Sequence, residues 1–115
     1  MDLRGINMNN STKWQPINSD QLHEHRNEWK IVDIRDPNAF SQGHIPGAFN
    51  LNNNNIQSFV NEQDFDKPLV VVCYVGNSSK GAAEMLCNAG FNNVYSLNGG
   101  MSFWRIQYPE LVEMG

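Results

Sequence analysis

Short apolar runs alternate with helix-like segments along most of the chain. Four runs have the length and composition of strands, and they lie at Trp14–Ile17, Lys30–Ile34, Leu69–Cys73 and Asn93–Leu97. A fifth extended segment, Phe49–Leu51, follows a glycine- and proline-rich turn. Leu69–Cys73 is apolar at every position, which is typical of a central strand in a parallel sheet.

Helices are predicted between these strands. Asn18 or Ser19 is suited to be an N-cap, and so is Asp36, which is followed by proline at the first helical position. The predicted helices run from 19 to about 29, from 37 to about 43, over Ile56–Val60, from Ala82 to about Gly90 and over Met101–Gln107. Strands separated by short helices predict an α/β domain with a mostly parallel central sheet flanked by helices.

Length and charge narrow the class of protein. A chain of 115 residues predicts one domain, which we place at residues 13–115, behind a polar tail over residues 1–12. The formal net charge of −4 argues against nucleic acid or an anionic membrane as a general partner. The chain shows neither a signal peptide nor an apolar stretch long enough to span a membrane.

The two cysteines indicate a reducing compartment. Cys73 closes a strand, whereas Cys87 falls inside the following helix, roughly 10 Å or more away at about 1.5 Å per residue. A disulfide between them is not expected at that separation. Free thiols are typical of the cytoplasm, where we place the protein.

Cys73 also lies at the end of a strand and before a helix, a position that suits a reactive thiol. Backbone N–H groups and the helix dipole at such a position stabilise an anion and lower the pKa of a cysteine. Gly76 permits backbone conformations closed to other residues, and Asn77 tolerates the left-handed region. A small cysteine that only packs at a strand end is the alternative.

We expect the loop after Cys73 to form an anion-binding nest of N–H groups around its sulfur. The residues expected to bind substrate are Tyr74, Val75, Gly76, Asn77, Ser78, Ser79 and Lys80. The Lys80 cation would favour a thiolate and an anionic donor. A solvated lysine at the start of the helix is an equally weighted alternative.

Three residue patterns of other cysteine enzymes are missing from this sequence. No histidine falls in the loop, which removes local support for a Cys–His protease pair. The chain has no C-x-x-C pair of the thioredoxin type. The loop also lacks the arginine with which a cysteine phosphatase holds a phosphoryl group, so a phosphatase or arsenate reductase is a weaker alternative.

The chain resembles the single-domain rhodaneses, and most closely their bacterial thiosulfate sulfurtransferases. The similarity lies in CYVGNSSKG at 73–81, in VDIRDP and GHIPGA between 32 and 48, and in NGGMSFW at 98–104. It extends from about Trp14 to Val112. Two positions depart from the family pattern. Ser78 stands where many rhodaneses have arginine. Val75 replaces an expected histidine, so we expect a higher KM for thiosulfate or a different preferred donor.

This resemblance implies a rhodanese fold and a sulfurtransferase. The Cys73 thiolate would attack thiosulfate, release sulfite and carry the outer sulfur as a persulfide. The acceptor would be cyanide in the assay, and the resemblance suggests a thioredoxin-like dithiol in the cell. It implies no metal or other cofactor, and a monomer or weak homodimer. A binding or regulatory module on the same fold is the alternative, and the presence of Cys73 disfavours it.

Other polar residues have predominantly structural interpretations. Asp33 and Arg35 point to the same side of their strand, where they either frame the pocket or form a structural ion pair, and we favour the ion pair. Asp36 is expected to cap its helix and His44 to make a hydrogen bond that fixes its turn. His23 and His25 do not have the spacing of a metal pair on a helix.

Three further side chains are expected to pack. The closing helix is predicted to bury Phe103 and Trp104 together. Cys87 is expected to be a packing thiol rather than a second reactive one.

Overall fold

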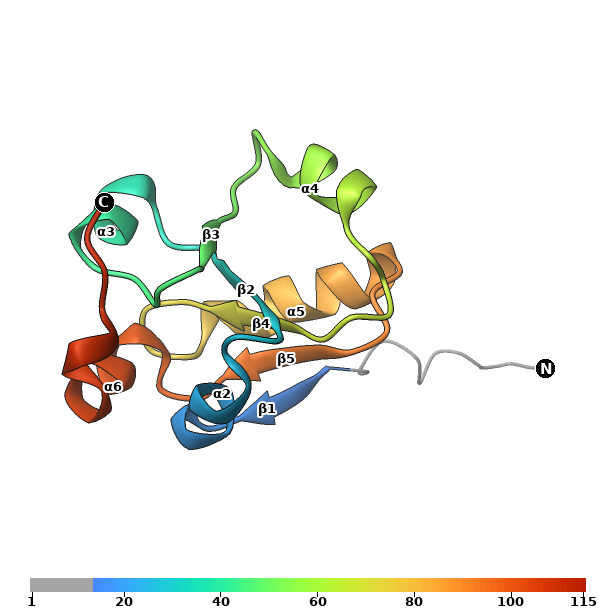
Figure 1. Ribbon diagram of the computed structural model, residues 1–115. Helices are drawn as coiled ribbons and strands as arrows, with labels where there is room; N and C mark the ends of the chain where they lie inside the picture. The colour runs from blue at the N-terminus through green and yellow to red at the C-terminus, as the bar shows by residue number, and fades with distance from the viewer. Residues whose placement is uncertain (1–13) are drawn as a thin grey trace.

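A five-stranded parallel sheet organises the computed structural model, which describes residues 14–115 (Figure 1). The strand order is β1-β5-β4-β2-β3, and every neighbouring pair runs parallel. The elements are β1 (Gln15–Ile17), α2 (Ser19–His25), β2 (Lys30–Asp33), α3 (Pro37–Gln42), β3 (Phe49–Asn50), α4 (Ile56–Glu62), β4 (Leu69–Val72), α5 (Ser78–Ala89), β5 (Val94–Leu97), α6 (Gly100–Gln107) and the 3₁₀ helix η2 (Pro109–Leu111). The predicted α/β fold is confirmed, and the apolar strand β4 lies at the centre.

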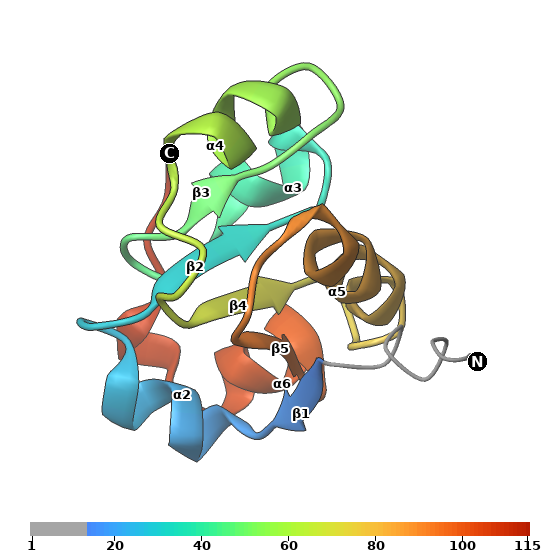
Figure 2. The ribbon, with the colours of Figure 1, turned by 90° about the vertical axis from the view of Figure 1, so that its right-hand side faces the viewer.

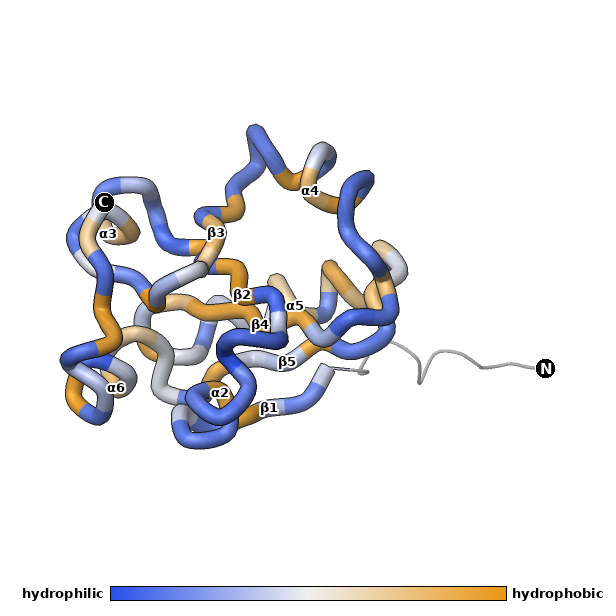
Figure 3. The backbone as a smooth tube through the Cα atoms, viewed as in Figure 1, coloured by the Kyte–Doolittle hydropathy of each residue, from blue (hydrophilic) through white to orange (hydrophobic). Residues whose placement is uncertain are grey.

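The sheet separates two hydrophobic clusters, and helices cover both faces (Figure 2). Val70 and Val72 point to one face, where they pack with side chains of α2 and α6. Leu69 and Val71 point to the other face, which α4 and α5 cover. This alternation is the period of two that a strand imposes on its side chains. Figure 3 shows the hydrophobic residues concentrated along β2 and β4, with hydrophilic segments outside them.

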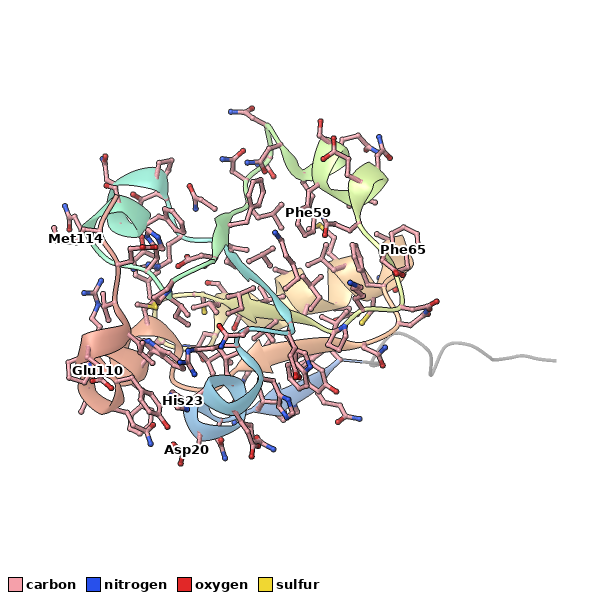
Figure 4. The ribbon with its side chains drawn as sticks, in the orientation of Figure 1. Asp20, His23, Phe59, Phe65, Glu110 and Met114 are labelled. Atoms are coloured by element: carbon pink, nitrogen blue, oxygen red, sulfur yellow. The ribbon has the colours of Figure 1, made fainter. Side chains whose placement is uncertain are left out.

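Aromatic side chains join α4 to the sheet and to the segment after α5. Phe59 points from α4 toward the sheet (Figure 4), and its ring centroid lies 5.5 Å from that of Phe49 and 6.1 Å from that of Phe91. Phe65 meets Phe91 edge-on, with 4.8 Å between centroids. These rings close one end of the second cluster, away from the carboxyl edge where Cys73 lies.

Helix α2 and the burial of α6 depart from the predictions. Helix α2 ends at His25 rather than near Trp29, because residues 26–28 form a turn in which the His25 carbonyl accepts from the N–H groups of Glu28 and Trp29. Trp104 is fully buried as predicted, but Phe103 is 47% exposed. Neighbouring residues on a helix point about 100° apart, so the face of α6 that buries Trp104 turns Phe103 toward solvent.

The two ends of the chain differ in what the structure describes. The predicted tail over residues 1–12 lies outside the described residues. At the other end, η2 and a bridge between His44 and Glu113 bring the C-terminal segment alongside the turn before β3, which the sequence did not indicate. Within residues 14–115, no helix has the length and apolar character needed to cross a membrane.

Candidate active site

Cys73 directly follows β4 at the carboxyl edge of the sheet, where parallel α/β sheets bind their ligands. The residue is 2% exposed. Its Sγ accepts two backbone hydrogen bonds, from the N–H of Gly76 at 3.1 Å and from the N–H of Ser79 at 3.2 Å. Donors converging on one sulfur make an environment that favours the thiolate.

The loop after Cys73 is shorter than predicted. Helix α5 begins at Ser78 rather than Ala82, which leaves only Tyr74–Asn77 outside regular structure. The first N–H groups of a helix have no partner within the helix, and the sulfur uses one of them, that of Ser79. Gly76 adopts the left-handed conformation, with φ +98°, whereas Asn77 is right-handed. The left-handed residue of this turn is therefore Gly76, and Asn77, which the sequence also allowed to be left-handed, is not.

The N-terminus of α6 holds the opposite side of this loop. The Met101 N–H donates to the Cys73 carbonyl at 2.9 Å, and the Ser102 N–H donates to the Tyr74 carbonyl at 3.0 Å. A Cβ on Gly100 would lie 2.5 Å from the Cys73 carbonyl oxygen, so only glycine fits there. With its carbonyls bound to α6, the loop presents N–H groups to the sulfur. Sequence reasoning missed this role, although the Gly99–Gly100 pair was its signal.

Hydrogen bonding lowers the pKa of the Cys73 thiol. Burial alone would raise the pKa of Cys73, because it removes water from the charged form. The side chain and N–H of Ser79, followed by the N–H groups of Gly76 and Val75, outweigh burial and bring the pKa below its ordinary value. The Ser79 hydroxyl in turn lies 2.7 Å from the Ser96 hydroxyl of β5.

The outer side of the site consists of exposed loop residues. Tyr74 is 48% exposed, and its hydroxyl donates to Asp36 Oδ2 at 2.5 Å. This bond lowers the pKa of Asp36 and raises the pKa of Tyr74. Asp36 also accepts from the Ala39 N–H at 3.0 Å, which confirms the predicted cap of α3. One carboxylate thus ties the α3 N-terminus to the loop, a contact between residues 38 positions apart.

Asp33 and Arg35 form a structural ion pair, the arrangement that we favour from the sequence over a role in framing the pocket. Arg35 Nη2 lies 2.8 Å from Asp33 Oδ2, and both side chains are buried. Arg35 also donates to the Gly43 carbonyl at 2.7 Å, which fixes the turn after α3. Its guanidinium carbon lies 5.7 Å from the centroid of the Tyr74 ring, so the pair also supports the loop.

The remaining loop residues have less direct positions. Val75 is 54% exposed, and Asn77, Ser78 and Lys80 are also exposed. The charge of Lys80 is not among the main causes of the lowered Cys73 pKa, which are burial and hydrogen bonds. Ser79 donates its N–H to the sulfur at 3.2 Å and its hydroxyl lowers the pKa of Cys73, and its burial distinguishes it from Ser78 and Lys80.

Other residues behave as packing or turn residues. His44 Nδ1 lies 2.9 Å from the Phe40 carbonyl, which confirms the predicted hydrogen bond in the turn. Cys87 packs against the cluster under α5, and it forms no disulfide with Cys73. In the part of the chain that the structure describes, no group of three or more His, Cys, Asp or Glu residues is arranged to hold a metal ion.

Comparisons with known proteins agree with this geometry. Residues 18–107 match the family described as the rhodanese-like domain. A Shewanella oneidensis protein named thiosulfate sulfurtransferase GlpE is 61% identical over 75 residues, which is 65% of this chain and 74% of the relative. A protein of the same name from Pseudomonas syringae pv. syringae is 46% identical over 105 residues, covering 90% of this chain and 99% of the relative. The crystal structure of a rhodanese-like domain protein from Staphylococcus aureus superimposes with a TM-score of 0.74 at 26% identity, covering 88% of this chain and 98% of that one.

Proposed function

The chain belongs to the rhodanese-like domain family, and we propose that it is a thiosulfate sulfurtransferase that carries sulfur as a persulfide on Cys73. Curated relatives at 46% and 61% identity are named for this activity. The observation that carries the assignment of Cys73 is the pair of N–H groups, from Gly76 and Ser79, within 3.2 Å of its sulfur.

In the first half-reaction the Cys73 thiolate attacks the outer sulfur of thiosulfate. A bond forms between Sγ and this sulfur, the sulfur–sulfur bond of thiosulfate breaks, and sulfite leaves with the electron pair. The persulfide then carries the single negative charge that the thiolate carried before. The N–H groups of the loop can stabilise this charge in both states.

In the second half-reaction a thiophilic acceptor attacks the outer sulfur and restores the Cys73 thiolate. Cyanide becomes thiocyanate in this step, and we infer that a thioredoxin-like dithiol is the acceptor in the cell. Both steps balance in atoms and charge without a metal or organic cofactor, and we propose that none is used. A covalent intermediate of this kind implies ping-pong kinetics.

The site favours a small donor. The Cys73 side chain is almost fully covered, and the backbone amides around it suit a compact anion more than a bulky one. The exposed Val75 contributes no polar group to the outer side of the site, so we keep the expectation of a higher KM for thiosulfate. Steady-state kinetics with thiosulfate, mercaptopyruvate and glutathione persulfide would rank the donors.

Two further properties follow as proposals. A thiolate nucleophile needs a reducing compartment to remain available, and we infer the cytoplasm. We further propose a monomer or weak homodimer, as the resemblance to single-domain rhodaneses implies.

A Cys73→Ser variant tests the proposal directly. Thiocyanate formation from thiosulfate and cyanide should be abolished while the circular dichroism spectrum stays unchanged. Mass spectrometry of the native protein after thiosulfate treatment should find one added sulfur on the peptide that contains Cys73. Cys87→Ser is the matched control and should keep both the adduct and the activity. An adduct on Cys87, or none, would contradict the assignment.

The same assays separate the alternative functions. A binding or regulatory module would form no adduct and no thiocyanate. A phosphatase would hydrolyse phosphate esters at a rate matching thiosulfate turnover. The described loop contacts to the sulfur come from backbone amides and a serine hydroxyl rather than a guanidinium, which disfavours phosphate chemistry.

A further inference from the structure

A buried pair of hydroxyl groups lies behind the reactive sulfur. Ser79, in the first turn of α5, and Ser96, in β5, are 0% and 1% exposed, and their Oγ atoms lie 2.7 Å apart. The cluster on this face of the sheet is otherwise apolar and includes Val71, Ala83 and Val94. A polar pair inside an apolar cluster carries a desolvation cost unless its hydrogen bonds are satisfied.

The Ser79 hydroxyl has two neighbours and one proton. It lies 2.7 Å from the Ser96 hydroxyl, and as a side-chain hydrogen-bond donor it lowers the pKa of Cys73; the N–H of the same residue lies 3.2 Å from the sulfur. A serine oxygen donates once and accepts through its lone pairs. When Ser79 gives its proton to the thiolate, it is left as the acceptor, and Ser96 must be the donor. The three groups then form one chain of hydrogen bonds from β5 to the sulfur.

We propose that Ser96 is a positioning residue that acts through Ser79: it donates to Ser79 Oγ and so directs the Ser79 hydroxyl proton to Cys73 Sγ. The backbone donors, Gly76 and Ser79 N–H, are fixed by the fold of the loop. The Ser79 hydroxyl is different because it rotates about its side-chain bond, and only a second group can set its direction. The inference rests on the proposed function of Cys73 as a nucleophile.

This series of hydroxyls adds to the hydrogen bonds that lower the pKa of Cys73, among whose main causes there is no charged side chain. Donors that hydrogen-bond in series polarise one another, so Ser96 strengthens the bond from Ser79 to the sulfur. These hydrogen bonds lie in an apolar cluster, where they are stronger than in water. We therefore expect Ser96 to affect the reactivity of Cys73 by way of Ser79, with which it shares the 2.7 Å contact.

The experiment measures the rate of Cys73 alkylation by iodoacetamide as a function of pH, using mass spectrometry of the Cys73 peptide. Ser96→Ala should move the midpoint of this curve to higher pH and lower the alkylation rate at neutral pH about threefold to tenfold. Ser79→Ala should lower it further. In the Ser79→Ala background, Ser96→Ala should have no additional effect, because its route to the sulfur is already lost.

Other residues and substitutions in the protein provide controls for this experiment. Ser19→Ala removes a hydroxyl that is equally buried but has no hydrogen-bond partner among the described residues, and it should leave the curve unchanged. Cys87, alkylated in the same samples, should keep its rate in every variant. Ser96→Thr and Ser96→Val have the same shape and differ in the hydroxyl, so Thr should retain the wild-type curve and Val should lose it even if the alanine variant fails to fold.

Two results would overturn the proposal. One is an unchanged alkylation curve in folded Ser96→Ala or Ser96→Val. The other is an equal loss from Ser96→Ala in the wild-type and Ser79→Ala backgrounds, which would indicate a purely structural tie between α5 and β5. Alkylation requires no thiosulfate, so neither result depends on whether Cys73 accepts sulfur.

Discussion

Hydrogen bonds lower the pKa of Cys73, and no charged side chain is among the main causes of this shift. Burial opposes ionisation of its thiol, and donors from Ser79, Gly76 and Val75 more than compensate. The arrangement suits the proposed alternation between thiolate and persulfide, because backbone N–H groups can donate to either anion without the movement of a side chain.

The pH dependence of the first half-reaction should follow the lowered pKa of Cys73. The thiol is inactive when protonated, so the rate of sulfite release should fall as pH drops through this pKa. It should level off at pH values above the lowered pKa of Cys73. Single-turnover measurement of sulfite across pH tests this, with Ser79→Ala expected to move the midpoint upward. A wild-type midpoint at or above the ordinary value would contradict the hydrogen-bond account.

The lowered pKa of Cys73 also makes the free energy of unfolding depend on pH. Because the pKa of Cys73 is lower in the folded than in the unfolded protein, ionisation of the thiol favours the folded state. This contribution is present above the unfolded-state pKa and is lost as pH falls through the folded-state pKa.

Two helix N-termini meet at the active loop and bind different sides of it. Helix α5 supplies an N–H group to the sulfur, and α6 supplies N–H groups to the carbonyls of Cys73 and Tyr74. Both helices have unsatisfied N–H groups in their first turns, and the loop satisfies some of them. The carbonyls of Cys73 and Tyr74 are bound to α6, and the Gly76 N–H donates to the sulfur. These bonds determine that N–H groups of the loop face the substrate.

Gly100→Ala should disrupt this arrangement. The new Cβ would meet the Cys73 carbonyl oxygen at 2.5 Å, and the residue has φ +54°, which disfavours any side chain. We expect a loss of about 1–3 kcal/mol in the free energy of unfolding and a fall of about 10–100-fold in kcat/KM. Urea denaturation and the thiocyanate assay measure the two effects.

Gly81→Ala provides the matched control for this prediction. Gly81 lies inside α5, and a Cβ there would meet no atom within 4 Å. Alanine in a helix interior should stabilise the protein by about 0.5–1 kcal/mol and preserve activity. If Gly100→Ala behaved like Gly81→Ala, the proposed hold of α6 on the loop would be wrong.

The molecule as a whole depends on packing on both faces of a small sheet. Trp104 of α6 is fully buried in the cluster that contains Val70 and Val72, the residues leading to Cys73. Its indole N–H also donates to the Leu111 carbonyl at 2.8 Å and so ties η2 to α6. The helix that binds the active loop is therefore anchored on the sheet by Trp104 together with the buried Met101.

Trp104→Ala should cost about 3–5 kcal/mol of unfolding free energy, a large fraction of the total for a domain of this size. Phe103→Ala, one residue earlier and 47% exposed, should cost much less, within about 1 kcal/mol. Urea midpoints of the two variants give the comparison. Equal costs would show that α6 does not dock through the face that the structure buries.

Local patterns were sufficient for most of the fold and for the position of Cys73. The apolar run at Leu69–Cys73, the N-caps at Asn18 and Asp36 and the glycine after α5 each involve neighbouring residues, so their physics is visible in a short stretch of sequence. The errors had both local and distant causes. Helices α2 and α5 depart from the prediction at ends where backbone hydrogen bonds join residues at most six positions apart. Phe103 is exposed because α6 docks on the sheet through Trp104.

The chemistry of the site was set by contacts between segments far apart in the chain. The bonds from α6 to the loop carbonyls, from Tyr74 to Asp36 and between Ser79 and Ser96 join residues separated by 17 or more positions. No period or composition reveals such pairs, because their partners meet only when the parallel strands bring their carboxyl ends to one edge. The proposal of Cys73 as nucleophile thus rests on neighbouring residues, whereas the direction of its hydrogen-bond donors depends on the assembled sheet and helices.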